Sequence, residues 1–66
     1  MIVIINGQKK TLSDALNINQ VLNSEGYKGM LVAVAQNGTF VPKGNYDQTK
    51  INDGDEIEIV APMQGG

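Results

Sequence analysis

The sequence contains no cysteine and no histidine. Without cysteine, the chain can form no disulfide, no thiolate metal site and no persulfide of its own. Without histidine, it lacks the side chain that most often serves as a general base and as a metal ligand. A chain of 66 residues also leaves little room for an internal active-site cavity. We therefore expect no bound metal or cofactor, and a protein that partner enzymes act on rather than an enzyme.

Positive charge and long apolar runs are also scarce. Five basic residues against seven acidic ones give a formal net charge of −2, whereas nucleic-acid binding requires a basic face. Apolar runs such as residues 1–5 are far shorter than the roughly 20 residues of a membrane-spanning helix. No charged segment precedes that run, as a signal peptide would require. We expect a single small globular domain in the cytoplasm that binds neither nucleic acid nor membrane.

The first 12 residues predict a β-hairpin. Residues 1–5 form a continuous, mostly β-branched run, which is typical of a strand buried on both faces near the middle of a sheet. Asn6-Gly7 favours a tight turn, because both positions tolerate positive φ. The return strand, residues 8–12, carries two lysines, and such charge suits a partly exposed edge strand.

Residues 18–25 predict one short helix. Asn17 and Gln20 have the spacing of a capping box, in which each side chain accepts from the other residue's backbone N–H. Three apolar residues at i, i+3 and i+4 then form a single stripe, and Gly26 can end the helix in the left-handed conformation. A helix of this length depends on packing against a sheet.

The second half of the chain predicts three more strands. Residues 31–36 and 39–41 flank an Asn-Gly turn, and residues 56–60 alternate glutamate with isoleucine, so that the two isoleucines share one face. The segment between, residues 43–50, is polar and turn-rich. We expect no helix longer than one turn there, with Tyr46 as its contact with the core.

This order of elements predicts an α+β fold. The first and last strands both have the pattern of central strands, and a right-handed crossover through the helix would make them parallel neighbours. A mixed sheet of about five strands with one main helix on one face is the β-grasp, or ubiquitin-like, fold. We expect residues 1–62 to form this domain and residues 63–66 to be a flexible tail.

The tail carries the most distinctive chemistry of the chain. Pro62 cannot donate a ladder hydrogen bond, so it is expected to end strand pairing. Gly65 and Gly66 have no Cβ, so the last residues can pass through a narrow channel. The α-carboxyl of Gly66 has an ordinary pKa of roughly 3.3–3.7 and is a poor electrophile when ionised. It becomes reactive only if another protein converts it to a mixed anhydride, such as an acyl-adenylate made from ATP.

Two surface features are candidates for partner docking. The first is an acidic group that could steer the tail toward a basic partner surface: Asp53, Asp55, Glu56 and Glu58. The second is an apolar patch on the sheet face that a single helix leaves uncovered: Ile2 and Ile4. The alternative for the acidic group is a turn followed by a solvated strand face, and the alternative for the isoleucines is that loops cover them.

The three aromatic residues do not predict a ligand site. Tyr27, Phe40 and Tyr46 lie far apart in the sequence, and no basic residues flank them in the pattern of nucleic-acid binding. We expect all three to be core or anchor residues.

Several motifs follow one another in the second half of the chain. They are residues 35–43, Tyr46, residues 52–60 and the terminal Gly65-Gly66. In this order and at this length, they resemble the family of thiamine-biosynthesis sulfur carrier proteins (ThiS). The chain departs from the family pattern at Lys43, where the family often has arginine, and at Gly44, which weakens a short helical turn expected there. The first half of the family varies widely.

The resemblance implies a specific role for the tail. An E1-like adenylyltransferase would use ATP to adenylate Gly66, and a cysteine desulfurase pathway would supply sulfur to convert the adenylate to a thiocarboxylate. The carrier would then deliver this sulfur to thiazole synthase. Met63, Gln64 and Gly65 would line the part of the tail that is threaded into the partner.

Other functions share these features. The small subunit of molybdopterin synthase is a similar carrier with the same tail, although it is usually longer. A ubiquitin-like modifier would instead leave Gly66 attached to lysines of other proteins. A plain interaction module would tolerate removal of Gly65 and Gly66.

Overall fold

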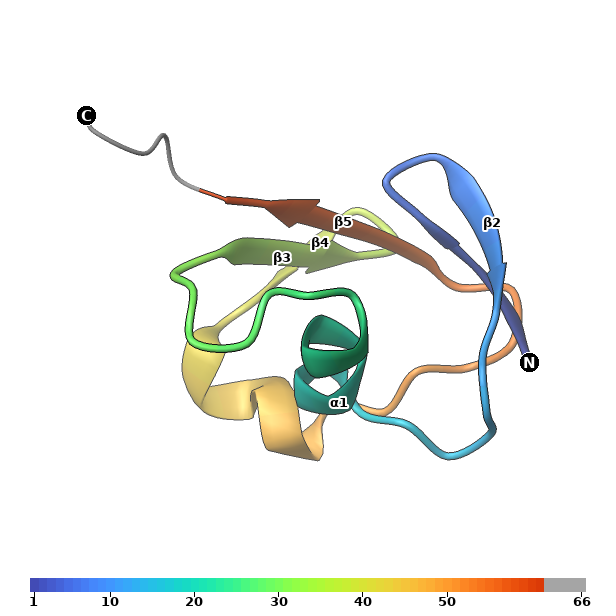
Figure 1. Ribbon diagram of the computed structural model, residues 1–66, viewed down its shortest axis with the longest axis horizontal. Helices are drawn as coiled ribbons and strands as arrows, with labels where there is room; N and C mark the ends of the chain where they lie inside the picture. Colours follow the sequence, from blue (N-terminus) through green and yellow to red (C-terminus); the bar gives the residue numbers. More distant parts are fainter. Residues whose placement is uncertain (62–66) are drawn as a thin grey trace.

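The computed structural model describes residues 1–61, so Pro62, which is expected to end strand pairing, and the predicted tail, residues 63–66, lie outside the described residues. The elements follow in this order: β1 (Ile2–Ile5), β2 (Gln8–Thr11), α1 (Ile18–Ser24), β3 (Ala33–Gln36), β4 (Thr39–Val41), the 3₁₀-helix η1 (Lys43–Gln48) and β5 (Glu56–Val60) (Figure 1). The β-β-α-β-β-β order predicted from the sequence is confirmed. Within residues 1–61, no helix has the length and apolar character that crossing a bilayer requires.

The five strands form one mixed sheet in the order β2-β1-β5-β3-β4. β5 lies between the two hairpins, as its red ribbon shows in Figure 1. It pairs parallel with β1, where Ile5 lies opposite Ile57, and antiparallel with β3, where Ala33 lies opposite Val60. The prediction that the first and last strands are adjacent and parallel is therefore confirmed, and the last strand occupies the centre of the sheet.

Both hairpins turn through an Asn-Gly pair in the conformation that the sequence predicts. Asn6 and Gly7 have φ values of 50° and 81°, and Asn37 and Gly38 have φ values of 51° and 81°. Positive φ at both central positions gives the turn a twist that matches the right-handed twist of the flanking strands. β1 and β3, the two neighbours of β5, each end at one of these turns.

The capping box of α1 forms as predicted. The backbone N–H of Gln20 donates to Oδ1 of Asn17 over 2.8 Å, and the backbone N–H of Asn17 donates to Oε1 of Gln20 over 2.9 Å. The helix ends at Ser24, one residue before the predicted end, and Gly26 has a φ of 90°. Its apolar stripe is buried against the sheet: Ile18, Val21 and Leu22.

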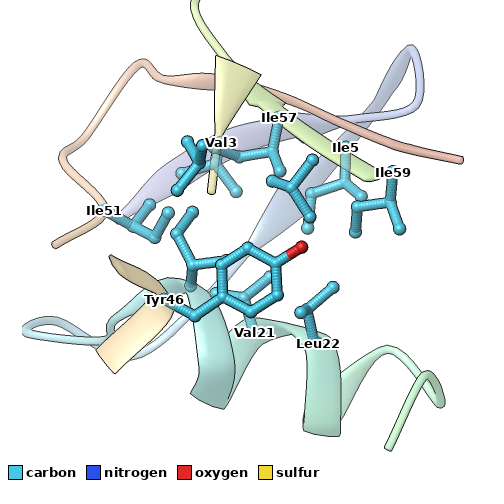
Figure 2. Close-up of a cluster of buried hydrophobic side chains, with 11 residues drawn as sticks. Val3, Ile5, Val21, Leu22, Tyr46, Ile51, Ile57 and Ile59 are labelled. Carbon is cyan, nitrogen blue, oxygen red and sulfur yellow. The ribbon is translucent and has the colours of Figure 1, made fainter. Parts of the chain in front are cut away.

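One face of the sheet and α1 enclose the core (Figure 2). Val3 and Ile5 from β1 and Ile57 and Ile59 from β5 are all buried. The prediction that β1 is buried on both faces is wrong, because Ile2 is 49% exposed. α1 covers only one face of the sheet, so the outward-facing residues of β1 have no second layer to pack against.

The segment after β4 contains more helix than the sequence predicted. η1 has six residues, which is two turns of 3₁₀-helix rather than one. The buried Tyr46 donates its hydroxyl to the carbonyl of Val32 over 3.2 Å, and Asp47 accepts from the side chain of Asn19 on α1 over 2.8 Å. These contacts with two other segments hold the helix despite Gly44, and Tyr46 contacts the core as predicted.

Candidate functional site

The sheet face opposite α1 carries an exposed apolar surface near the end of β5. The strand register places Phe40 beside Ala35, and Ala33 beside Val60. Phe40 is 66% exposed and Val60 is 64% exposed. We call this surface the open-face patch: Leu31, Ala33, Ala35, Phe40 and Val60, which line two shallow hollows. The prediction that Phe40 belongs to the core is wrong, because its neighbour Val41 is the residue of β4 that points inward.

The open-face patch borders the point where the chain leaves the sheet. Val60 is both a member of the patch and the last residue of β5. The residues predicted to be threaded into a partner and modified are Met63, Gln64, Gly65 and Gly66, and they lie outside the described residues. A partner that engaged the chain at the end of β5 would therefore also meet this apolar surface.

Four of the six residues predicted to form docking surfaces lie on the same open face. Ile2, Glu56 and Glu58 are exposed, and Ile4 is partly buried and pairs with Glu56. Glu58 also borders the open-face patch. The structure therefore brings the predicted isoleucines and glutamates together on the uncovered face.

The two aspartates of the predicted acidic surface have different surroundings. Asp53 is exposed, and its Oδ1 accepts from the backbone N–H of Ile2 over 2.6 Å. Asp55 is only 7% exposed, so its carboxylate is not available as a docking surface. Asp55 Oδ2 accepts from the side chain of Gln36 and the backbone N–H of Asn52, both over 2.8 Å, and Oδ1 accepts from the side chain of Asn37 over 3.0 Å.

This carboxylate ties the β3–β4 turn to the start of β5. Burial raises the pKa of the Asp55 carboxyl, but hydrogen bonds from the Asn37 side chain, the Asn52 N–H and the Gln36 side chain outweigh burial, and the pKa lies below its ordinary value. These donors favour the ionised form because an ionised carboxylate only accepts hydrogen bonds. Asp55 is therefore a structural residue that stabilises the fold as an anion.

We expect Asp55 to make the folding stability depend on pH. Because its pKa is lower in the folded chain than the ordinary value of about 3.9, the unfolded chain takes up the proton first. The contribution is present above about pH 4 and is lost as the pH falls through the folded pKa. Urea unfolding of the parent protein and of Asp55→Asn should show that the variant is less stable at neutral pH and that the difference shrinks in acid. A difference that did not change with pH would contradict this assignment.

The asparagines of both turns have a second function that the sequence analysis missed. Nδ2 of Asn6 donates to the carbonyl of Ile59 over 3.1 Å, and Oδ1 of Asn6 accepts from the N–H of Ile59 over 2.7 Å. Oδ1 of Asn37 accepts from the N–H of Glu56 over 2.9 Å. Each turn therefore also holds the backbone of β5. An Asn-Gly pair predicts a turn, but the strand that its side chain contacts is set by the topology.

The described part of the chain contains no cluster of metal-ligating side chains. Residues 1–61 contain no set of three carboxylate, histidine or cysteine side chains close enough together to hold an ion. The site that the described residues do form is an exposed apolar and acidic sheet face next to the end of β5.

A mixed five-stranded sheet crossed by one α-helix, with its last strand at the centre, defines the ubiquitin-like β-grasp class. The family model that matches is described as the ThiS family and covers residues 3–66. The chain belongs to this family.

Solved structures of ThiS are closely similar to this chain. The crystal structure of the thiamine biosynthesis protein ThiS from Geobacter metallireducens superposes with a TM-score of 0.84 at 29% identity, over 100% of both chains. A solution structure of a thiamine biosynthesis protein from the same organism has the same TM-score and identity and is covered over 88% of its length. These likenesses agree with the β-grasp fold and the family.

Sequence relatives include one much longer protein. The chain is 39% identical, over its whole length, to a protein of Paramagnetospirillum magneticum called thiazole synthase, of which it spans only 20%. It is also 32% identical to the uncharacterized protein ycf40 of Porphyra purpurea, over 94% of this chain and 87% of that protein. The chain thus resembles both a small protein of its own size and a segment, about a fifth in length, of a larger one.

Proposed function

We propose that this protein carries sulfur for the biosynthesis of the thiazole ring of thiamine, as a thiocarboxylate on Gly66. The observation that carries the proposal is the match to the ThiS family, which extends to residue 66 and so includes the Gly-Gly end. The position of β5 supports it, because the central strand leads directly to these residues. The protein would act in the cytoplasm as a carrier on which partner enzymes act.

The proposed chemistry begins at the α-carboxylate of Gly66. An E1-like adenylyltransferase would let a carboxylate oxygen attack the α-phosphorus of ATP, which forms an acyl-adenylate and releases pyrophosphate. A persulfide that a desulfurase forms from cysteine would then attack the carbonyl carbon and displace AMP, which gives an acyl disulfide. A thiol such as cysteine would cleave the S–S bond, which leaves a thiocarboxylate on Gly66 and oxidises the thiols to a disulfide. The absence of cysteine from the chain agrees with this chemistry, because the sulfur would be held on a carbonyl carbon and not on a thiol.

The acceptor of the sulfur is proposed to be thiazole synthase. A protein called thiazole synthase contains a segment similar to the whole of this chain. A carrier domain within the same polypeptide as the acceptor would keep the two at high effective concentration. This similarity supports thiazole synthase as the acceptor of sulfur from this chain.

Intact-mass spectrometry tests the function directly. The protein is incubated with ATP, cysteine, the E1-like enzyme and a cysteine desulfurase, and the expected product has one oxygen of the Gly66 carboxylate replaced by sulfur. The same reaction without ATP is the control and should leave the mass unchanged. An unchanged mass in the complete reaction would contradict the proposal. Attachment to lysines of other proteins, seen after denaturing purification, would identify a protein modifier instead.

The open-face patch is proposed to dock the adenylating enzyme, together with the neighbouring Ile2, Ile4, Glu56 and Glu58. Its apolar residues are exposed and lie beside the end of β5, where a partner that holds the tail must contact the domain. A contiguous exposed apolar patch is typical of an interaction site.

Phe40→Glu is expected to raise the KM of the adenylating enzyme for the carrier by about tenfold or more, because a large, exposed aromatic residue is a common source of binding energy at an interface. The measurement is ATP–pyrophosphate exchange as a function of carrier concentration. Asn23→Glu, which adds the same charge to the exposed side of α1, is the control and should leave KM unchanged. Equal KM values for the two variants would show that the enzyme docks elsewhere.

A further inference from the structure

The side chain of Asn6 takes the place of a missing strand residue beside β5. β1 ends at Ile5, opposite Ile57, and the backbone N–H of Asn6 donates to the carbonyl of Ile57 over 2.9 Å before the chain turns away. The next backbone groups of β5 on this side belong to Ile59. Both are bound by the amide of Asn6, at 3.1 Å for the carbonyl and 2.7 Å for the N–H.

This pairing extends the support of β5 almost to its last residue. On the other side, β3 pairs with β5 as far as Val60. The strand is therefore held on both sides at Ile59, and without the amide of Asn6 only β3 would hold it beyond Ile57. The direction in which the chain leaves the sheet is fixed by two neighbours instead of one.

We propose that Asn6 is a positioning residue for the modification of Gly66, and this inference rests on the proposed function. Gly66 is seven residues beyond Ile59. Where a partner holds those residues extended, at about 3.3 Å per residue, a swing of about 10° at Ile59 corresponds to roughly 4 Å at the end of the tail. A displacement of about 1 Å of a reacting group can lower a rate about 100-fold.

The second hairpin supplies a matched control. Asn37 has the same turn conformation as Asn6, with a φ of 51° against 50°. Its side chain also binds the backbone of β5, but at Glu56, the first residue of the strand, and it binds Asp55 as well. Removing the Asn37 side chain therefore removes two hydrogen bonds, as many as removing that of Asn6 does. It leaves the hydrogen bonds at the end of β5 in place.

The experiment compares Asn6→Gly and Asn37→Gly with the parent protein. Glycine accepts positive φ, so both turns keep their backbone conformation while the amide is lost. In hydrogen exchange, Asn6→Gly should expose the amide of Ile59, whereas Asn37→Gly should expose that of Glu56. In ATP–pyrophosphate exchange with the E1-like enzyme, Asn6→Gly should lower kcat by about tenfold and change KM by less than about twofold. Asn37→Gly should keep the parent kcat even if its unfolding midpoint falls further.

The possible negative results distinguish failure of the proposed function from failure of the positioning role of Asn6. A parent protein that supports no ATP–pyrophosphate exchange would refute the proposed function, and the role of Asn6 with it. A parent protein that is active, with the same kcat in Asn6→Gly or an equal loss in both variants, would overturn the positioning role alone. Unchanged exchange of the Ile59 amide in Asn6→Gly would also overturn it. If Asn6→Gly does not fold, Asn6→Asp replaces it and kcat alone decides, because aspartate keeps the acceptor for the N–H of Ile59 but faces its carbonyl with a negatively charged oxygen instead of a donor.

Discussion

Thiocarboxylate formation is expected to fall to background when one glycine is added after Gly66. The added residue moves the α-carboxylate along the tail by about 3.3–3.6 Å and leaves residues 1–66 unchanged. Adenylation requires the attacking oxygen and the phosphorus to approach in a near-attack geometry, and a displacement of this size exceeds what such a geometry tolerates. Intact mass after incubation with ATP, cysteine and the partner enzymes gives the readout.

The unfolding midpoint of the extended protein is the control and should equal that of the parent protein, since the addition follows the last strand. Deletion of Gly66 should likewise reduce thiocarboxylate formation to background and leave the unfolding midpoint unchanged. The decisive observation is made on protein whose extra residue is still attached when thiazole formation is measured. If that protein still supplies sulfur, Gly66 does not bear the sulfur and the carrier proposal must be dropped.

Ile57→Ala is expected to remove a large part of the protein's stability. Ile57 is 1% exposed, lies opposite Ile5 of β1 and Gln36 of β3, and is on the sheet side of the core in Figure 2. Truncating a buried isoleucine to alanine costs about 2–5 kcal/mol, whereas 66 residues are stabilised by only about 3–10 kcal/mol in total. Thermal unfolding followed by circular dichroism should show a loss of about 10 °C or more.

The neighbouring position provides the control for this variant. Glu58 is exposed on the opposite face of β5, so Glu58→Ala should change the free energy of unfolding by less than about 0.5 kcal/mol. Similar midpoints for the two variants would mean that the alternation of β5 does not divide core from solvent as described.

Local patterns predicted the elements and their order. The caps of α1, both Asn-Gly turns and the alternation of β5 depend on residues close together in the sequence, and all of them form as expected. The parallel pairing of β1 with β5 also followed, because both strands have apolar patterns and one helix connects the two halves. Each of these inferences needs only short spacings or the chain order.

The surroundings of single side chains were harder to predict. Asp55 has the pattern of an exposed acidic turn, but two of its partners, Gln36 and Asn37, lie 19 and 18 positions earlier in the chain. Ile2 and Phe40 are as apolar as core residues, yet they lie on the face that α1 does not cover. A single sequence gives their hydrophobicity but not the number of layers that pack on the sheet.

The central place of β5 has a consequence for how the protein is made. Residues 56–60 are synthesised after every other strand, yet both hairpins reach one another only through them. While the chain is still growing on the ribosome, β1 and β3 each present an unpaired edge and the core lacks Ile57 and Ile59. Because pairing between distant segments closes large loops, it is slow compared with local folding. The domain therefore cannot complete its fold before residues 56–60 have been synthesised, and the two hairpins must remain soluble until this strand is available.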